Sequence, residues 1–558
     1  MSKKDITVTL QNGRTVVYPV NTPIEKLLPE ENQSRKDGLD VIGAMVNNDV
    51  VSLTFPLEVD SHIRFLTMGD AHGWRIYRRS VSFILAKAVR ELYPSAKFSI
   101  EHSLGTGFYC HFEMNGRAGI TEEQLDSIGG YMLEMVAENS RIERRKISYG
   151  DAVKQFEGEG QIDKFDLLRF RNPSKVVIYE CDGFSDLAHG PMARYTGTLG
   201  HFKLIHYPPG FVIQFPEREN APHFAKFEEQ PHLFQIFREH KQWGRILGVQ
   251  TAGQLNAYTA GGETEEFIRI AEALHEKKIA RIADNIAERN PQVKSILVAG
   301  PSSSGKTTFS KRLAVQLKVN GLQPVTISVD DYFVDREHTP RDEHGQLDFE
   351  HIETIDLKLF NEHLRALDAG EEVELPKFNF AIGKREYKGN KMKIGEDQLL
   401  IIEGIHALNP RLTEQVPAPH KFKVYVSALT QLNLDFNNRI STTDNRLIRR
   451  MIRDNRFRGN SALATLQMWP NVRRGEKRWV FPFQNEADIA FNSALDYELA
   501  VLKSMVEPLL LEIKPHHLQY AEARRLQDFL RGFIAIPVDQ VPPTSILREF
   551  TGKSNFRY

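Results

Sequence analysis

Cysteine is scarce in this 558-residue sequence, which contains only Cys110 and Cys181. Two thiols cannot form the disulfide framework of a small secreted protein or a four-thiolate zinc site, so a reducing compartment is expected. Apolar runs approaching the length of about 18 residues needed for a membrane helix are also missing, and the first residues lack the apolar core of a signal peptide. These absences predict a cytoplasmic protein without a membrane-spanning segment.

Neither sign of charge is in excess, because 72 Lys and Arg residues balance 73 Asp and Glu residues and the net charge is −1. Such a chain has no global field that would attract nucleic acid or a membrane surface, so any such binding must be local. The length of 558 residues also exceeds what one hydrophobic core usually serves, and roughly three or four domains are expected.

Hydrophobic patterns change along the chain and indicate a multidomain protein. The N-terminal half mixes alternating strand patterns with helical ones, which indicates α+β structure. A long helical apolar repeat follows and is interpreted as a connector. Beyond it, short apolar strands alternate with helical segments, the pattern of an α/β parallel sheet with flanking crossover helices. The expected domains are 1–65, 66–240, 241–292 (the helical connector) and 293–558.

The segment ILVAGPSSSGKTTFSKRLAVQL, residues 296–317, has the features of a phosphate-binding loop between a strand and a helix. Gly300 and Gly305 allow backbone N–H groups to surround phosphate oxygens, Lys306 reaches the β- and γ-phosphates, and Thr307 offers a hydroxyl to Mg²⁺. The strand before and the helix after argue against a mere glycine-rich turn. ATP with Mg²⁺ is the expected phosphoryl donor, with GTP left open. The predicted nucleotide-binding positions are Gly300, Pro301, Ser302, Ser303, Ser304, Gly305, Lys306, Thr307 and Thr308.

Acidic residues follow two further apolar strands, at the sheet edge where open α/β sheets bind their ligands. Asp330 follows the strand ending at Val329 and could accept a proton from a substrate hydroxyl, although an Asp at this place could equally cap a helix. Glu403 ends the strand LLIIE and is a candidate ligand of Mg²⁺, directly or through water. Lys306 and Asp330 are therefore the predicted catalytic residues.

An arginine-rich stretch, residues 439–459, contains seven arginines against two aspartates. A solvated helix face is the usual explanation of such a run. A lid that closes over transferring phosphate also needs guanidinium groups at this density.

Residues 295 to about 500 resemble the uridine kinase branch of the phosphoribulokinase/uridine kinase family. The motifs that carry this resemblance occur in the family's order: Asp330-Asp331-Tyr332-Phe333, Phe349-Glu350-His351, Pro376-Lys377-Phe378-Asn379-Phe380, Glu403-Gly404 and the arginine-rich stretch. The resemblance implies that Asp330 activates a ribose 5′-hydroxyl. It implies phosphate roles for two lid residues, and it places four residues at the acceptor. The lid residues are Arg453 and Arg458, and the acceptor residues are Phe333, Glu350, Phe378 and Arg450.

Departures from the family gather where its members contact the nucleobase. The family's base-contacting His, Arg and Gln are similar in position to Gly383, Asn460 and Met468. Its motif tyrosine is Phe378 and its ribose-binding Asp is Glu350. The resemblance therefore implies a nucleoside or other ribose-containing acceptor, with weak or altered preference for uridine.

The N-terminal half resembles two modules of threonyl-tRNA synthetase. Residues 1–65 are similar to the ubiquitin-like β-grasp domain called TGS, and residues 66–240 to the editing region, through LYPSAKFSIEHSLGTGFYCHFEMNG and FSDLAHGPMARYTGTLGHFKLI. The editing chemistry of that family depends on a His-x-x-x-His pair and a Cys-x-x-x-His pair. The corresponding positions here are Arg79, Phe83, Ala188 and Met192. The resemblance thus implies a retained fold without hydrolysis, and a ligand that could be RNA, a metabolite or another protein.

Two functions are compatible with these observations. The first is a nucleoside kinase of the uridine kinase type with an N-terminal binding or regulatory module. The second is an RNA-binding or regulatory protein that uses nucleotide binding as a switch. Asp330 distinguishes them, because a kinase needs a base for an organic hydroxyl and a switch does not.

Overall fold

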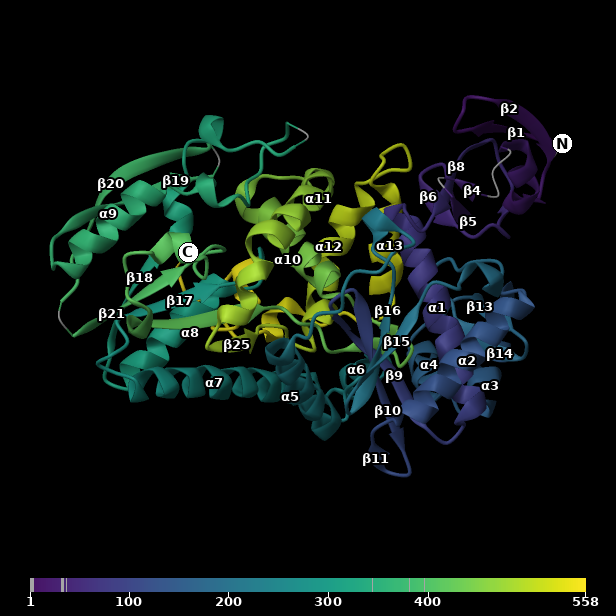
Figure 1. The fold of residues 1–558 in the computed structure, drawn as a ribbon, viewed down its shortest axis with the longest axis horizontal. Coiled ribbons are helices and arrows are strands. Elements are labelled where there is room, and N and C mark those ends of the chain that lie inside the picture. Colours follow the sequence, from purple (N-terminus) through teal and green to yellow (C-terminus); the bar gives the residue numbers. More distant parts are fainter. Residues whose placement is uncertain are drawn as a thin grey trace.

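In the computed structural model the chain forms two halves joined by a central group of helices (Figure 1). The structure describes residues 5–31, 35–36, 38–343, 345–380, 382–395 and 397–557. The N-terminal sheets lie at one end and the C-terminal parallel sheet at the other, with α10, α12 and α13 between them in this view. The expected combination of α+β and α/β structure is confirmed.

The described residues between 5 and 67 include a six-stranded mixed sheet with the order β2-β1-β8-β5-β4, in which β6 pairs with β5. The first strand lies parallel to the last, as Val8 pairs with Ser61, and a 3-10 helix at Ile24–Glu31 buries Ile24 and Leu27 against the sheet. The strands are β1 (Asp5–Leu10), β2 (Thr15–Pro19), β4 (Arg35–Lys36), β5 (Leu39–Val46), β6 (Asp49–Val51) and β8 (Ser61–Thr67), beside the short pair β3 (Thr22–Pro23) and β7 (Pro56–Leu57).

The second part of the N-terminal half is built on a long helix, α1 (Ala71–Leu92), whose apolar residues enter a core shared with two small sheets. One sheet has the order β11-β10-β16-β15, with β9 paired to β10, and the other has the order β12-β13-β14. The elements are β9 (Lys97–Leu104), β10 (Gly107–Met114), β11 (Arg117–Ala118), α2 (Glu122–Glu138), β12 (Glu143–Ser148), α3 (Tyr149–Gly158), α4 (Ile162–Arg169), β13 (Lys175–Cys181), β14 (Phe184–Leu187), β15 (Lys203–Tyr207) and β16 (Gly210–Gln214).

Three helices connect the halves, where the apolar repeat predicted one connector helix. They are α5 (Pro231–Leu247), α6 (Ala252–Gly261) and α7 (Thr264–Glu288). Helix α7 contains the predicted repeat and buries Ile279, Ile282 and Ile286 against the C-terminal sheet.

The C-terminal half contains a five-stranded, all-parallel sheet with the order β18-β21-β17-β22-β25. The central strands β17 and β21 are buried almost throughout because helices cover both faces, which explains their continuous apolar sequences. The strands are β17 (Ser295–Ala299), β18 (Gln323–Ser328), β21 (Gln398–Glu403), β22 (Lys421–Ser427) and β25 (Ile489–Asn492). The helices are α8 (Lys306–Val319), α9 (Leu357–Asp368), α10 (Thr442–Arg458), α11 (Ala462–Trp479), α12 (Glu498–Leu511), α13 (Tyr520–Leu530) and α14 (Arg548–Thr551).

Two antiparallel hairpins leave this sheet: β19 (Val373–Asn379) with β20 (Lys384–Met392), and β23 (Asn433–Asp435) with β24 (Asn438–Arg439). The second hairpin inserts into the N-terminal half. Ile100 donates its N–H to the Phe436 carbonyl at 2.8 Å, and the Asn433 amide donates to the Ile100 carbonyl at 2.9 Å.

One hydrophobic cluster lies on both sides of the predicted boundary at residue 240. It joins Phe156, Leu167 and Ile178 of the N-terminal half to residues of α6, α7, α10 and α12. The two halves therefore share a core. Within the described part of the chain, none of the helices combines the length and the apolar character that crossing a bilayer requires.

Candidate active site

The predicted phosphate-binding loop connects β17 to α8, as expected for a strand–loop–helix device. Gly305 is the N-cap of α8 and has the left-handed backbone conformation, with φ of 83°. A Cβ atom at this position would lie 2.5 Å from the Ile546 side chain. Glycine is thus required both by the turn and by the close approach of the C-terminal segment.

Lys306 and Thr307 begin α8 beside the end of β21. The Lys306 Nζ is buried and donates to the Pro301 carbonyl at 3.3 Å, so it folds back along the loop. The Thr307 hydroxyl donates to the Glu403 carboxylate at 3.4 Å. The structure therefore brings the two predicted Mg²⁺ ligands together.

Glu403 is a buried carboxylate, and its pKa is raised by burial and by the nearby Asp330 and Glu549, against the opposing charge of Lys306. A carboxylate that is so poorly solvated and lies beside a hydroxyl is a suitable oxygen donor for a divalent cation, which would favour its charged form. The protein alone supplies few ligands: among the residues that the structure describes, no group of three His, Cys, Asp or Glu could hold a metal ion.

Asp330 lies in a 3-10 turn, Val329–Tyr332, because β18 ends at Ser328, one residue earlier than predicted. The next two residues face elsewhere. Asp331 pairs with Lys377 at 3.3 Å, and the Tyr332 hydroxyl bonds to His363 at 2.9 Å. Asp330 raises the pKa of both Glu350 and Glu403, whereas Lys306 lowers both. The turn thus places Asp330 on the side of the loop lysine.

Glu350 is buried, and its pKa is raised to about 7 by burial and by Glu476, while Arg450 and Lys306 oppose this shift. Arg450 donates to the Ser302 hydroxyl of the phosphate-binding loop at 2.8 Å. These two predicted acceptor residues therefore border the loop itself. Near pH 7 Glu350 exchanges between its protonated and charged forms.

Three phenylalanines form a cluster next to the acceptor side. The Phe333 ring lies 5.5 Å from Phe378 and 6.2 Å from Phe380, and the latter two rings are 5.2 Å apart. The Arg458 guanidinium lies 4.4 Å from the Phe380 ring centroid. Phe333, Phe378 and the lid residue Arg458 are thus neighbours, and Phe380 is a member that the sequence prediction left without a role.

Arg336 fills the space over Gly383. A Cβ atom on Gly383 would lie 2.7 Å from the Arg336 Nε, and the Arg336 guanidinium donates to the Phe380 carbonyl at 2.9 Å. A depression of about 360 Å³ adjoins this place, lined by Asp335, Arg336, Glu337, Arg341, Leu347, Ile382, Gly383 and Lys384. The position where the family has a base-contacting side chain is therefore occupied by an arginine from another segment.

Five of the six arginines of α10 form two groups, and the sixth, Arg456, is exposed. Arg450, Arg453 and Arg458 surround Asp454, at 3.2, 2.8 and 3.8 Å, and their charges lower the pKa of that carboxyl. A second group is fully buried: Arg446 pairs with Glu476, and Arg449 pairs with Glu498. The arginine-rich stretch is therefore neither a solvated helix face throughout nor a lid of free guanidinium groups throughout. Arg446 and Arg449 are buried in ion pairs and contact the backbone of the phosphate-binding loop.

Two carboxylates that the sequence prediction missed bond to the phosphate-binding loop and its helix. Glu476 accepts from the Ser302 N–H at 3.0 Å. Glu549 accepts from the Thr308 N–H at 3.1 Å and from its hydroxyl at 2.8 Å. The Ser302 N–H belongs to the loop and the Thr308 N–H to the first turn of α8, so the chain's own carboxylates accept hydrogen bonds from groups that phosphate would use. Glu549 lies outside every recognised motif, and no sequence signal identified it.

In the N-terminal half, the four editing-like positions lie close together without forming a polar site. Phe83 and Met192 are buried in one core with the partly buried Ala188, and the Phe83 ring is 5.2 Å from Phe184. Arg79 donates to the Pro191 carbonyl at 2.9 Å. Apolar packing and one guanidinium thus take the place of ionisable side chains at these positions.

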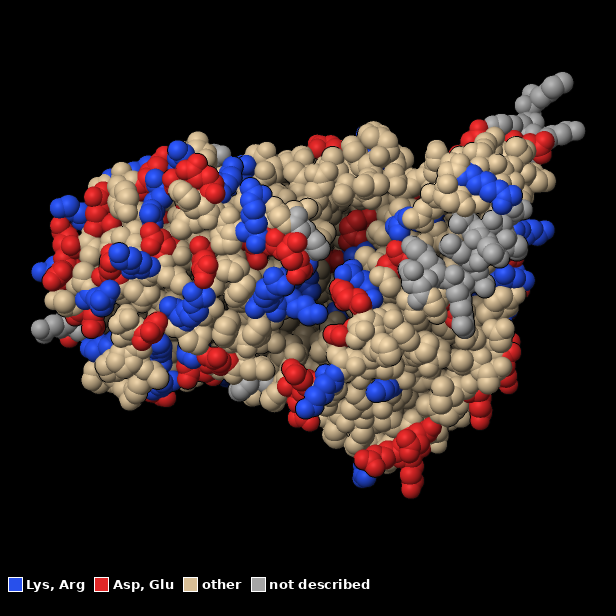
Figure 2. Space-filling view, turned by 45° about the horizontal axis from the view of Figure 1, so that its top comes forward, with Lys and Arg blue, Asp and Glu red and all other residues tan. Residues whose placement is uncertain are grey.

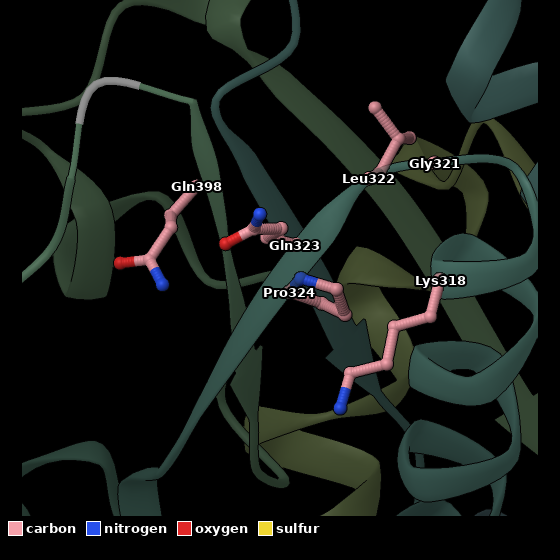
Figure 3. Close-up of a pocket in the computed structure, with 6 residues that line it drawn as sticks. All are labelled: Lys318, Gly321, Leu322, Gln323, Pro324 and Gln398. Atoms are coloured by element: carbon pink, nitrogen blue, oxygen red, sulfur yellow. The ribbon is translucent and has the colours of Figure 1, made fainter.

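A second depression, of about 420 Å³, lies at the opposite edge of the parallel sheet (Figure 3). It is lined by Lys318, Gly321, Leu322, Gln323, Pro324 and Gln398. Gln323 and Gln398 begin β18 and β21, so this depression is at the amino ends of the strands. The carboxyl ends, with Asp330 and Glu403, are the expected ligand edge of such a sheet.

The family model of the phosphoribulokinase / uridine kinase family matches residues 295–500. The N-terminal region matches threonine–tRNA ligases: that of Pelobacter propionicus is 34% identical over 218 residues, covering 37% of this chain and 34% of the relative. The enzyme of Desulforamulus reducens is 28% identical over 257 residues, covering 44% of this chain and 40% of the relative. The chain thus spans well under half the length of these relatives.

Solved structures with a similar C-terminal half include a candidate fructose transport system kinase from Silicibacter sp. TM1040, at 20% identity and a TM-score of 0.30. It covers 38% of this chain and 98% of that chain. A candidate uridine kinase from Bacillus stearothermophilus has 17% identity and a TM-score of 0.27, covering 39% and 98%. Residues 295–500 thus match the model of the phosphoribulokinase / uridine kinase family and contain a phosphate-binding loop, and the N-terminal region is similar to threonine–tRNA ligases.

Proposed function

We propose that this protein transfers a phosphoryl group from ATP to the 5′-hydroxyl of a ribonucleoside or a related ribose compound. One observation carries most of the support. Lys306 of the phosphate-binding loop and Asp330 of the neighbouring strand end act on the same two buried carboxylates, Glu350 and Glu403. A phosphate-binding group and a candidate base thus lie around one small region at the carboxyl edge of the sheet.

In this proposal Asp330 accepts the proton of the attacking hydroxyl, and Lys306 turns from the Pro301 carbonyl to the transferring phosphate. Arg450, already bonded to the loop at Ser302, and the lid residues Arg453 and Arg458 stabilise the negative charge that the transfer develops. Thr307 and Glu403 would hold Mg²⁺, which supplies charge neutralisation between the phosphates when it is bound.

Recognition of the acceptor follows from the remaining groups. Glu350 is a carboxylate that could bind ribose hydroxyls, and Phe333 and Phe378 offer aromatic surface on which a sugar or base could pack. With Arg336 over Gly383, the base position lacks the side chains that select a pyrimidine edge in the family. Base selectivity should therefore be weak or altered.

A second candidate is a regulatory protein in which nucleotide binding acts as a switch for the N-terminal half, whose ligand would be RNA, a metabolite or a protein. The insertion of β23–β24 into that half, directly before α10, favours this alternative. It needs no proton acceptor for an organic hydroxyl, and it predicts hydrolysis or binding of nucleotide without an acceptor.

The deciding experiment measures kcat/KM across uridine, cytidine, adenosine, guanosine, inosine and free ribose, with ATP and with GTP. Asp330→Asn should retain ATP binding and slow transfer by about two or more orders of magnitude, while Lys306→Ala should lose phosphate stabilisation. Near wild-type turnover in Asp330→Asn, or nucleotide consumption independent of every acceptor, would reject the kinase. A preference for uridine above about a hundredfold over all purine nucleosides would show that other residues rebuild the base pocket.

A further inference from the structure

The two halves meet at a cluster of arginines that lies away from the phosphate-binding loop. It consists of Arg75 and Arg78 on α1, Arg439 on β24 and Arg525 on α13, with the carboxylates of Asp444 on α10 and Glu522 on α13. Figure 2 shows the molecule hollowed between its halves, with acidic and basic side chains around the hollow. The cluster has four guanidinium groups for two carboxylates.

Arg525 bonds to both carboxylates, and Arg75 bonds to Glu522. Arg525 donates to the two oxygens of Asp444 at 2.7 and 2.8 Å and to Glu522 at 2.6 Å. Arg75 completes the chain through a bidentate pair with Glu522. Two-point pairing of this kind uses most acceptor positions of a carboxylate, so little remains for further cations.

Arg78 and Arg439 are the two cations left over. Arg439 donates its Nε–H to the Glu101 carbonyl at 3.2 Å, and no ion pair of either residue occurs among the described residues. Arg78 makes no side-chain hydrogen bond in the described part of the chain, and its Nε is buried without a partner. Both guanidinium groups are half-buried without an ion-pair partner among the residues that the structure describes, and such burial costs folding free energy unless an anion binds beside them.

Aromatic rings contact both guanidinium groups, and the two groups approach the same ring, that of Phe108. Arg78 lies 3.5 Å from the Trp74 ring centroid and 5.0 Å from that of Phe108, and Arg439 lies 4.8 Å from the same Phe108 ring. A ring that stacks on a guanidinium group orients its plane but provides no hydrogen-bond acceptor for the N–H donors at its edge. Among the described residues, only the Arg439 Nε–H of the two guanidinium groups has a hydrogen-bond acceptor, the Glu101 carbonyl.

The groups around the cluster are influenced by its positive charge. His72 has its pKa lowered to about 4 by burial and by the charges of Arg75, Arg525 and Arg64, against the opposing charge of Glu522. Burial and the charge of Arg439 lower the pKa of Arg78, which Asp444 only partly offsets. The nearby Glu101 carboxylate is engaged by Lys241 at 3.4 Å, so it does not supply the missing anion.

We propose that Arg78 and Arg439 bind the phosphate group of a phosphate monoester, carried either by a small metabolite or by the end of an RNA strand. Guanidinium edges match tetrahedral phosphate through paired N–H donors, and a dianion would balance the two excess positive charges. The site is contributed by both halves and does not depend on the kinase reaction. Because α10 begins at Thr442, a bound phosphate would also fix the segment that leads into the arginine-bearing helix.

The test uses the full chain carrying Lys306→Ala, so that phosphate binding at the P-loop is weakened and cannot be mistaken for the new site. Isothermal titration with inorganic phosphate and thermal denaturation with and without phosphate are compared in this background and after adding Arg78→Gln and Arg439→Gln. Arg117→Gln, on the exposed strand β11, is the matched control. The expected result is phosphate binding that falls at least tenfold in the double variant and is unchanged in the control.

The two phosphate sources are separated by ribose 5-phosphate and by a short RNA with and without a terminal phosphate. Tighter binding of either phosphorylated ligand than of inorganic phosphate, lost with the double variant, identifies the source. If Gln at both positions prevents folding, Arg78→Lys and Arg439→Lys retain the charge and remove the paired donors, and the same loss is expected. Phosphate binding that is absent, or equally strong in the arginine variants, would overturn the proposal. Equal binding of RNA with and without its terminal phosphate would exclude RNA as the source, and the monoester proposal would be overturned if ribose 5-phosphate also bound no more tightly than inorganic phosphate.

Discussion

Glu549 should compete with nucleotide for the first turn of α8, and replacing it by Gln should strengthen ATP binding. Its carboxylate accepts from the N–H and the hydroxyl of Thr308 at 3.1 and 2.8 Å. The helix end at which Thr308 lies is the one that the phosphate-binding loop presents to phosphates. ATP must therefore break these bonds or bind against a nearby negative charge.

The size of the effect follows from the bonds that ATP displaces. A hydrogen bond to a charged group contributes about 1.5–3 kcal/mol, and about 1.4 kcal/mol corresponds to a tenfold change in Kd. Glu549→Gln keeps the shape and removes the charge, so the Kd for ATP is expected to fall by about 10- to 100-fold. Ile546 and Phe550 are anchored in the same core as Phe309 of α8, so we expect the side chain to turn away while the segment stays in place.

The assay is titration with a fluorescent ATP analogue in the presence of Mg²⁺, with Glu512→Gln as control because Glu512 is exposed at the end of α12. Loss of an acidic group at the start of α8 should also lower the free energy of unfolding by about 1 kcal/mol, measured by urea denaturation without nucleotide. Unchanged or weaker ATP binding in a folded Glu549→Gln protein would refute the reasoning, because the carboxylate would then not compete with phosphate.

Three other outcomes are expected. The Glu350 pKa is raised from 4.5 to about 7, so the wild type should lose stability on the order of 3 kcal/mol as pH rises between these values. Glu350→Gln should lose much less in urea denaturation at pH 5 and pH 8; parallel curves would contradict the assignment. Glu403→Gln should raise the Mg²⁺ concentration needed for half-maximal activity, and an unchanged Mg²⁺ titration would count against a metal role. The purified protein should not deacylate seryl- or threonyl-tRNA, since Phe83 and Met192 are packed in a core. Release of serine or threonine above the enzyme-free blank would contradict this prediction.

Local patterns predicted the parallel sheet and the phosphate-binding loop because both are encoded by neighbouring residues. The apolar strands of the C-terminal half, buried on both faces, could be recognised from their continuous sequence. Gly305 could be recognised in the same way, because the loop motif requires a glycine at this position and the structure shows it in the left-handed conformation. The family motifs predicted Glu350 and Arg450 at the acceptor, and in the structure Arg450 bonds to Ser302 of the loop.

Contacts between distant segments could not be predicted in this way. The approach of Glu549 to Thr308 spans 241 residues, and Arg336 reaches Gly383 only because a turn and a hairpin pack together. The arginine-rich stretch shows the same limit. Composition alone could not separate Arg446 and Arg449, which have buried carboxylate partners, from arginines that face the lid, because the partners Glu476 and Glu498 come from other helices.

The hairpin β23–β24 is the part of the connection between the halves most relevant to regulation, and it adds charged and polar contacts to the shared hydrophobic core. Asp435 is fully buried, accepts from the backbone of Asn437 and Asn438 at 3.0 Å, and lies 2.7 Å from His189 of the N-terminal half. Its pKa is lowered by Lys164 and His189 despite burial, so the carboxylate is held charged. Removing one partner of such a buried pair costs about 3–5 kcal/mol. The hairpin should therefore follow any displacement of the N-terminal half, and α10 starts three residues after it ends. A ligand that shifts the N-terminal half would consequently act on the helix that carries Arg450 and Arg453.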